Sequence, residues 1–156
     1  MRVFLDTEFT DFINMDLISL GMVSESGETF YAEHQGYERS WCSDFVRQIV
    51  IPLLGKDPKA QYATLTRIRD EVLAYLGKWK DEGVIISVDY AGDWNLFLDV
   101  LGDKLPEWVK GELIRHQLDD VAVRQYYELT GLPNHHALND ALANKMGWRP
   151  PPPEEQ

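Results

Sequence analysis

Cysteine is almost absent from this chain of 156 residues, in which Cys42 is the only one. An intramolecular disulfide is therefore excluded, and the paired cysteines of a zinc finger are missing. Basic residues are also few: 15 Lys and Arg are outnumbered by 26 Asp and Glu, which gives a formal net charge of −11. We do not expect so acidic a protein to coat long duplex DNA or an anionic membrane, because both kinds of binding depend on excess Lys and Arg.

Long apolar runs are missing as well, and none approaches the roughly 20 residues that a membrane span needs. The first residues, MRVFLDTEF, lack the apolar core of a signal peptide, so we expect a cytoplasmic protein with no membrane partner. Hydrophobic residues make up 44% of the chain, which is enough for a buried core. The length fits one domain, placed at 1–149, followed by a Pro-rich acidic tail at 150–156 that we expect to be extended and disordered.

The apolar pattern predicts strands first and helices later. Segments 2–6, 17–24 and 29–33 have the composition of strands, and a Ser-Gly turn before the third favours an antiparallel meander. A continuous apolar run predicts a strand at 84–88 that is buried on both faces, and 112–117 is a candidate strand. Helical spacing predicts helices at 43–53, bent or ended by a proline, and at 65–79, 93–101, 119–129 and 137–145. This order predicts an α/β domain in which helices flank a mixed sheet.

Two carboxylates, Asp6 and Glu8, lie two residues apart at the end of the first predicted strand. The strand period of two places both on one face of the sheet. Two anions on a packed sheet are costly unless a cation accompanies them, and hard divalent cations take oxygen ligands. The pair is therefore a candidate metal site, although a D-x-E pattern alone also fits a solvent-exposed strand end.

Two later segments add candidates. Asp93 opens a predicted helix on its sheet-facing side, where it fits either a site residue or an N-cap, and Asp89 at the end of the buried strand is an alternative. In the run HHALND, Asp140 borders a stripe of small apolar residues. His135 would lie about 140° from Asp140 on a helix. Both can serve one site only if His135 reaches in from the preceding loop while Asp140 projects from the helix.

These three segments together resemble the DEDDh branch of the DnaQ-like 3′–5′ exonucleases, which includes RNase T and oligoribonuclease-like enzymes. The resemblance extends over nearly the whole body of the chain, from DTEF at 6–9 to HHALNDA at 135–141. The chain differs from the family where Gly92 precedes Asp93, because the family usually has an aromatic residue there. The short length and the DTEF start look most like a small stand-alone exoribonuclease branch.

The resemblance implies an RNase H-like fold and a two-metal mechanism. Two divalent cations, Mg²⁺ or Mn²⁺, would be held by four carboxylates: Asp6, Glu8, Asp93 and Asp140. His135 would act as the general base that takes a proton from the attacking water. The candidate contacts to the terminal nucleotide are Thr7, Phe9 and Trp94.

The implied substrate is single-stranded or 3′-overhanging RNA, from which nucleoside 5′-monophosphates would be released. The preference for RNA over DNA comes from the resemblance alone, so an exodeoxyribonuclease is an alternative. A non-catalytic interaction module is another, but it would be expected to lack one of the carboxylates or the histidine. A hydrolase of free nucleotides would be expected to carry a phosphate-binding loop such as G-x-x-x-x-G-K-[ST], which is missing. Similar enzymes are frequently homodimers, so the resemblance also implies a homodimer.

Overall fold

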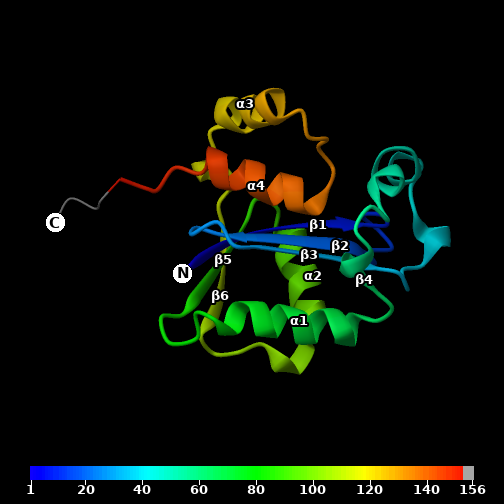
Figure 1. Ribbon diagram of the computed structural model, residues 1–156, viewed down its shortest axis with the longest axis horizontal. Coiled ribbons are helices and arrows are strands. Elements are labelled where there is room, and N and C mark those ends of the chain that lie inside the picture. Colours follow the sequence, from blue (N-terminus) through cyan, green and yellow to red (C-terminus); the bar gives the residue numbers. More distant parts are fainter. Residues whose placement is uncertain (153–156) are drawn as a thin grey trace.

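A six-stranded mixed sheet forms the middle layer of the structure, a computed structural model that describes residues 1–152 (Figure 1). The spatial order of the strands is β4-β3-β2-β1-β5-β6. The first three strands form the predicted antiparallel meander, whereas β5 runs parallel to β1, β6 to β5 and β4 to β3. The strands are β1 Arg2–Phe9, β2 Leu17–Ser24, β3 Thr29–His34, β4 Gln61–Tyr62, β5 Val84–Val88 and β6 Val109–Leu113.

Helices cover both faces of the sheet (Figure 1). On one face, α1 packs against β3, and α2 packs against β1 and β5; on the other, α4 crosses β1 and β2 and carries α3 on its outer side. The helices are α1 Leu65–Gly77, α2 Ala91–Leu101, α3 Asp120–Thr130 and α4 Ala137–Gly147. The predicted α/β class with a mixed sheet is confirmed, and the arrangement is compatible with an RNase H-like fold.

Successive side chains along β1 point alternately toward the helices on the two faces of the sheet. Leu5 belongs to the main core against α1 and α2, whereas Phe4 packs with Ala141 of α4. Asp6 and Glu8 continue the Phe4 row, so both carboxylates face α4, as the period of two predicts.

Small residues let α4 approach the sheet closely. Ala137 and Ala141 are fully buried at this contact, and Gly21 of β2 lies beneath the start of the helix. A Cβ atom on Gly21 would lie 2.3 Å from the backbone nitrogen of Leu138, so only glycine fits there. The small residues around Asp140 therefore permit a close approach of α4 to the sheet, which brings that carboxylate next to β1.

The segment after Ser43 is not the regular helix that its spacing predicts. It forms a π-helical turn at Val46–Val50 followed by a 3₁₀ turn at Ile51–Leu53. Pro52 causes the change, because it has no N–H to donate and its ring clashes with the preceding helical turn. Phe45 consequently leaves the core and is half-exposed beside a cavity.

Other boundaries also differ from the prediction. The strand at 84–88 is confirmed, but Ile85 is exposed because α4 lies over β1 and β2 rather than over β5. The candidate strand at 112–117 is shifted: β6 ends at Leu113, and a 3₁₀ turn follows at Arg115–Gln117. The two-residue strand β4 is not predicted, since so short a segment has no measurable period.

The C-terminal segment contributes no helix or extended strand after α4 in the described part of the chain. Residues 150–152 of the expected tail are exposed, and the rest of that prediction falls on 153–156, outside the described residues. None of the helices within 1–152 combines the length and the apolar character needed to cross a bilayer.

Candidate functional site

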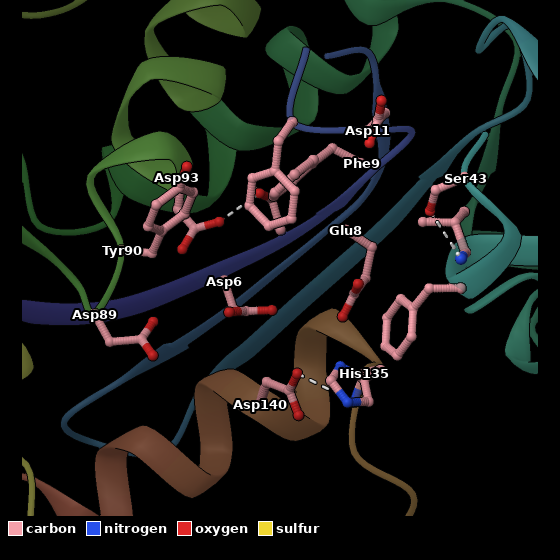
Figure 2. Close-up of a pocket in the computed structure, with 14 residues that line it drawn as sticks. Asp6, Glu8, Phe9, Asp11, Ser43, Asp89, Tyr90, Asp93, His135 and Asp140 are labelled. Atoms are coloured by element: carbon pink, nitrogen blue, oxygen red, sulfur yellow. Dashed lines mark hydrogen bonds between the residues drawn. The ribbon is translucent and has the colours of Figure 1, made fainter. Parts of the chain in front are cut away.

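The site lies where β1 continues beyond its neighbour β5 (Figure 2). Residues Arg2–Phe4 of β1 pair with β5, and β5 ends at Val88, level with the middle of β1. The C-terminal half of β1 therefore borders a crevice on this side. Ligands of α/β proteins commonly bind in crevices outside the carboxyl ends of the strands.

A cavity of about 600 Å³ occupies this crevice. Side chains from β1, from the loop after β5, from α2 and from α4 with its preceding loop all point into it (Figure 2). Six carboxylates and one imidazole belong to its lining: Asp6, Glu8, Asp11, Asp89, Asp93, Asp140 and His135. All five residues predicted to hold cations or move a proton are thus brought into one cavity.

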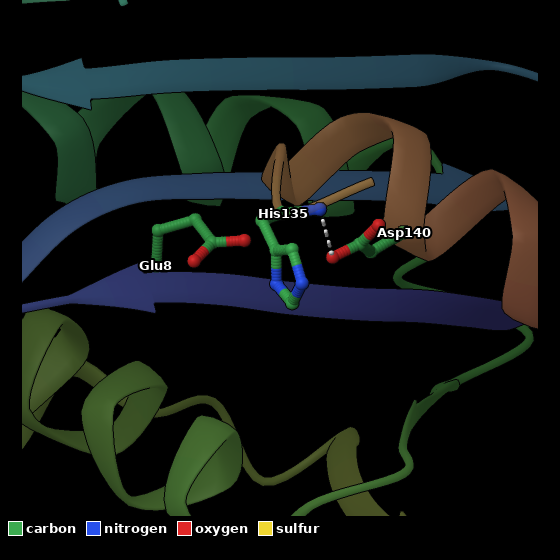
Figure 3. A group of neighbouring side chains, drawn as sticks. All are labelled: Glu8, His135 and Asp140. Atoms are coloured by element: carbon green, nitrogen blue, oxygen red, sulfur yellow. Dashed lines mark hydrogen bonds between the residues drawn. The ribbon is translucent and has the colours of Figure 1, made fainter. Parts of the chain in front are cut away.

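The side-chain ligand atoms form two neighbouring groups. One group consists of Asp6, Asp89 and Asp93, and the other of Glu8, His135 and Asp140 (Figure 3); within each, the atoms lie within 4.8 Å of one another. Each group is of the size and chemistry that could hold a metal ion.

One buried oxygen atom indicates whether a cation would fit in the cavity. Oδ2 of Asp6 is buried and has no hydrogen-bond partner within residues 1–152. A buried carboxylate oxygen without a donor is costly, and a bound cation would remove that cost. The oxygen-rich donor set also suits hard divalent ions. The residues present therefore fit a divalent metal centre.

His135 and Asp140 reach the cavity in the way their spacing predicts. His135 lies in the loop before α4 in the left-handed backbone region, with φ of 58°, which L residues seldom adopt. Its backbone N–H donates to Oδ2 of Asp140 at 3.2 Å, so the loop and the helix are joined at the site (Figure 3). Phe45 lies edge-on to the imidazole, with ring centroids 4.9 Å apart. His136 stacks on Tyr31 instead and caps α4.

Asp89 and Asp93, the two alternatives in the sequence, both line the cavity and belong to the same group of ligand atoms. Helix α2 begins at Ala91, which places Asp93 inside the first turn rather than at the N-cap. Its Oδ1 accepts a hydrogen bond of 2.6 Å from the Thr7 hydroxyl. Thr7 lines the cavity as predicted, but its buried hydroxyl is engaged with Asp93, so its side chain positions a carboxylate.

Aromatic side chains form one wall of the cavity. Phe9 lies in the predicted place, with its ring centroid 5.3 Å from that of Phe12 and 6.3 Å from that of Tyr90. Trp94 does not reach the cavity. It follows Asp93 by one residue and is therefore turned by about 100° around the helix. Its ring stacks on Phe97 and covers Gly111 of β6, so it belongs to the packing between α2 and the sheet.

Sequence reasoning misses several contributors to the site, including Phe12, Phe45 and Tyr127. Phe12 is 72% exposed in the loop after β1, and a large apolar side chain in a polar loop is the signal that could have found it. Phe45 fits a core helix by its spacing and so gives no sign of a role at the site. Tyr127 of α3 donates its hydroxyl hydrogen bond to Oδ1 of Asp140, and nothing in the local sequence indicates this contact.

Burial and mutual repulsion raise the pKa values of the clustered carboxyl groups. The pKa of Asp6 lies well above its usual range because of burial, with further repulsion from Asp93, Asp140 and Glu8. Burial, followed by repulsion from Asp140 and Asp93, raises the pKa of Glu8 to about 8. Burial raises the pKa of Asp93 to about 7 against the effect of the Thr7 hydrogen bond. For Asp140, burial raises the pKa to about 6, opposed by the Tyr127 hydroxyl and by His135.

These raised pKa values predict that the metal-free protein loses stability as the pH rises. A carboxyl group whose pKa is raised by folding stabilises the fold below its unfolded pKa, and this contribution is lost as the pH rises through the folded value. A pKa difference of one between the folded and unfolded states corresponds to about 1.4 kcal/mol. Because the pKa of Glu8 is about 8 and that of Asp93 about 7, we expect Tm in EDTA to fall between pH 5 and pH 8. The expected fall is about 10 °C or more.

The measurement is thermal unfolding across this pH range with EDTA and with Mn²⁺. We expect Mn²⁺ to abolish most of the slope, because a bound cation favours the ionised carboxylates. Glu8→Gln should reduce the slope in EDTA, whereas Glu107→Gln, at an exposed position, should leave it unchanged. Equal slopes with EDTA and with Mn²⁺ would contradict the prediction.

No protein-family model matches the chain, and no curated protein matches it in sequence. The fold and the site together define a class: a mixed α/β domain with an acidic cavity at the carboxyl ends of parallel strands that could hold a metal ion.

Proposed function

We propose that this protein is a metal-dependent 3′–5′ exoribonuclease of the DEDDh type. The observation that carries the proposal is the convergence of four carboxylates and one histidine, from three separate segments of the chain, in one cavity. They are Asp6, Glu8, Asp93, Asp140 and His135. A surface patch of acidic residues would not leave a carboxylate oxygen buried without a donor, as Oδ2 of Asp6 is.

In the proposed reaction, water adds to the last phosphorus and the bond to the penultimate 3′ oxygen breaks. The terminal nucleoside 5′-monophosphate is released, and the new 3′ oxygen takes up a proton. Two divalent cations, when bound, supply positive charge to the attacking and leaving oxygens. The four carboxylates hold these cations, with Asp89 as an additional oxygen donor beside Asp6 and Asp93.

His135 supplies the base of the proposed reaction. A ring nitrogen of its imidazole takes the proton of the attacking water, which requires the neutral form of the ring. Phe45 packs against the imidazole. The hydrogen bond from the His135 backbone N–H to Asp140 fixes the loop that carries the imidazole. These contacts restrict the rotation of the imidazole and keep it beside the carboxylates of Glu8 and Asp140.

The aromatic wall and the charge of the chain favour a short single-stranded 3′ end. Phe9, Phe12 and Tyr90 offer ring faces on which a terminal base can stack, and stacking accepts any base. With a net charge of −11, the chain has little means of holding a long phosphate backbone, so binding would depend on the cations and these local contacts.

The experiment that tests the proposal follows the shortening of 5′-labelled single-stranded RNA and of the matching DNA. We expect a one-nucleotide ladder on RNA with Mn²⁺ or Mg²⁺ and no products in EDTA. Asp93→Asn should abolish the ladder, and Asp99→Asn, an exposed position on the same helix, should leave it unchanged. No shortening of either strand with either metal would overturn the proposal, and shortening of DNA alone would assign the exodeoxyribonuclease instead.

A further inference from the structure

Tyr127 connects the outermost helix to the candidate metal centre. It belongs to α3, which packs on the outer side of α4. Its hydroxyl crosses to α4 and donates a hydrogen bond to Oδ1 of Asp140. A phenol has a single O–H to donate, and here that donor is used on a carboxylate of the site.

Both oxygens of the Asp140 carboxylate are thereby held. Oδ1 accepts from the Tyr127 hydroxyl, and Oδ2 accepts from the backbone N–H of His135 at 3.2 Å. Two donors on different oxygens fix the plane of a carboxylate and leave a second lone pair of each oxygen available. Hydrogen bonds of this kind orient metal-ligating side chains, and their removal commonly weakens metal binding.

We propose that Tyr127 is a positioning residue that holds the Asp140 carboxylate in the orientation required for cation binding. The inference rests on the proposed function only through the metal centre, so it can be tested by metal binding without any nucleic acid. Tyr127 would act through Asp140, because it is not among the residues that line the cavity.

The packing of α3 separates this role from that of a core tyrosine. No side chain of α3 is fully buried. Helices that support a fold usually do so through a buried apolar stripe, and α3 lacks one. The adjacent Tyr126 lies on the same helix, and its hydroxyl has no hydrogen-bond partner within residues 1–152. The two neighbouring tyrosines therefore form a natural pair of test and control positions.

The experiment measures Mn²⁺ affinity by titration calorimetry for the wild type, Tyr127→Phe and Tyr126→Phe. Both variants remove one hydroxyl oxygen and keep the ring. We expect Tyr127→Phe to bind Mn²⁺ about 10- to 100-fold more weakly, and Tyr126→Phe to bind as the wild type does. A purely structural role would lower Tm and leave the affinity unchanged.

A double-mutant cycle tests whether the effect passes through Asp140. In an Asp140→Ala background, which removes the acceptor of the Tyr127 hydroxyl, Tyr127→Phe should cause no further loss of Mn²⁺ affinity. Wild-type affinity retained in Tyr127→Phe, or an equal loss in both backgrounds, would overturn the positioning role while leaving the proposed function intact. A wild type that binds no Mn²⁺ would overturn the positioning role together with the metal centre.

Discussion

Replacing Asp6 with asparagine is expected to abolish the proposed nuclease activity and, at the same time, to stabilise the metal-free protein. Asp6 is central to the carboxylate cluster, and its pKa is raised by burial and then by the charges of Asp93, Asp140 and Glu8. Asparagine has nearly the same shape and carries no charge. In EDTA at pH 7.5 the variant should therefore unfold at a higher temperature than the wild type, because the cost of burying this carboxyl group, and then of placing it among other carboxylates, has been removed.

The loss of activity should be about 10³-fold or more, because a ligand to a metal that stabilises transition-state charge contributes several kcal/mol. Activity on labelled RNA and Tm in EDTA are measured on the same preparations. Asp99→Asn removes a carboxylate from an exposed position of α2 and should change neither quantity. A Tm for Asp6→Asn at or below that of the wild type would contradict the view that the carboxylates repel one another in the absence of a cation.

Gly21→Ala is expected to lift α4 from the sheet and to disrupt the site without touching any candidate ligand. The added Cβ would meet the backbone of Leu138 at 2.3 Å and that of Ala137 at 2.4 Å. Backbone atoms cannot rotate away as a side chain can, so the helix must move. Overpacking of this kind costs about 3 kcal/mol, and we expect Tm to fall by about 6 to 12 °C.

Displacement of α4 also moves His135 and Asp140 away from Glu8, so Mn²⁺ affinity should fall together with Tm. The matched control is Gly77→Ala at the end of α1, where an added Cβ has no neighbour within 4 Å. Alanine is favoured over glycine in helices, so this variant should be unchanged or slightly more stable. A Gly21→Ala protein with wild-type Tm and Mn²⁺ affinity would show that α4 can shift without cost.

The parts of the fold that the sequence predicts well are those with a clear local period. Strand β2 has the predicted bounds Leu17–Ser24, and α3 begins at Asp120, one residue after the predicted start, with Asp119 accepting from two backbone N–H groups as its N-cap. The D-x-E pair on β1 faces one side for the same reason, since a period of two leaves no other choice. Each of these features is decided within a short stretch of chain.

What the sequence does not predict depends on contacts between distant segments. Asp89 and Asp93 look like alternatives in the sequence. In the fold, β1 continues past the end of β5, so Asp6 lies close to both side chains, and no local sequence pattern indicates this. The expectation that Trp94 reaches the site is wrong because one residue after Asp93 the side chain is turned by about 100°, where it packs on Phe97 and covers Gly111 of β6. Tyr127 meets Asp140 only through the packing of α3 on α4, which no local pattern encodes.

The packing of α4 on β1 and β2 determines when the site can form during synthesis of the chain. Translation produces the chain from its N-terminus, so a chain made as far as α3 carries Asp6, Glu8 and Asp93 but lacks His135 and Asp140. The group of Asp6, Asp89 and Asp93 is then present in full, but the second group is reduced to Glu8. On the proposed function, a nascent chain cannot digest the messenger RNA that is still being read to make it. If the proposed function holds, hydrolysis requires His135 and Asp140, so it can begin only after α4 has been synthesised and has packed on β1 and β2.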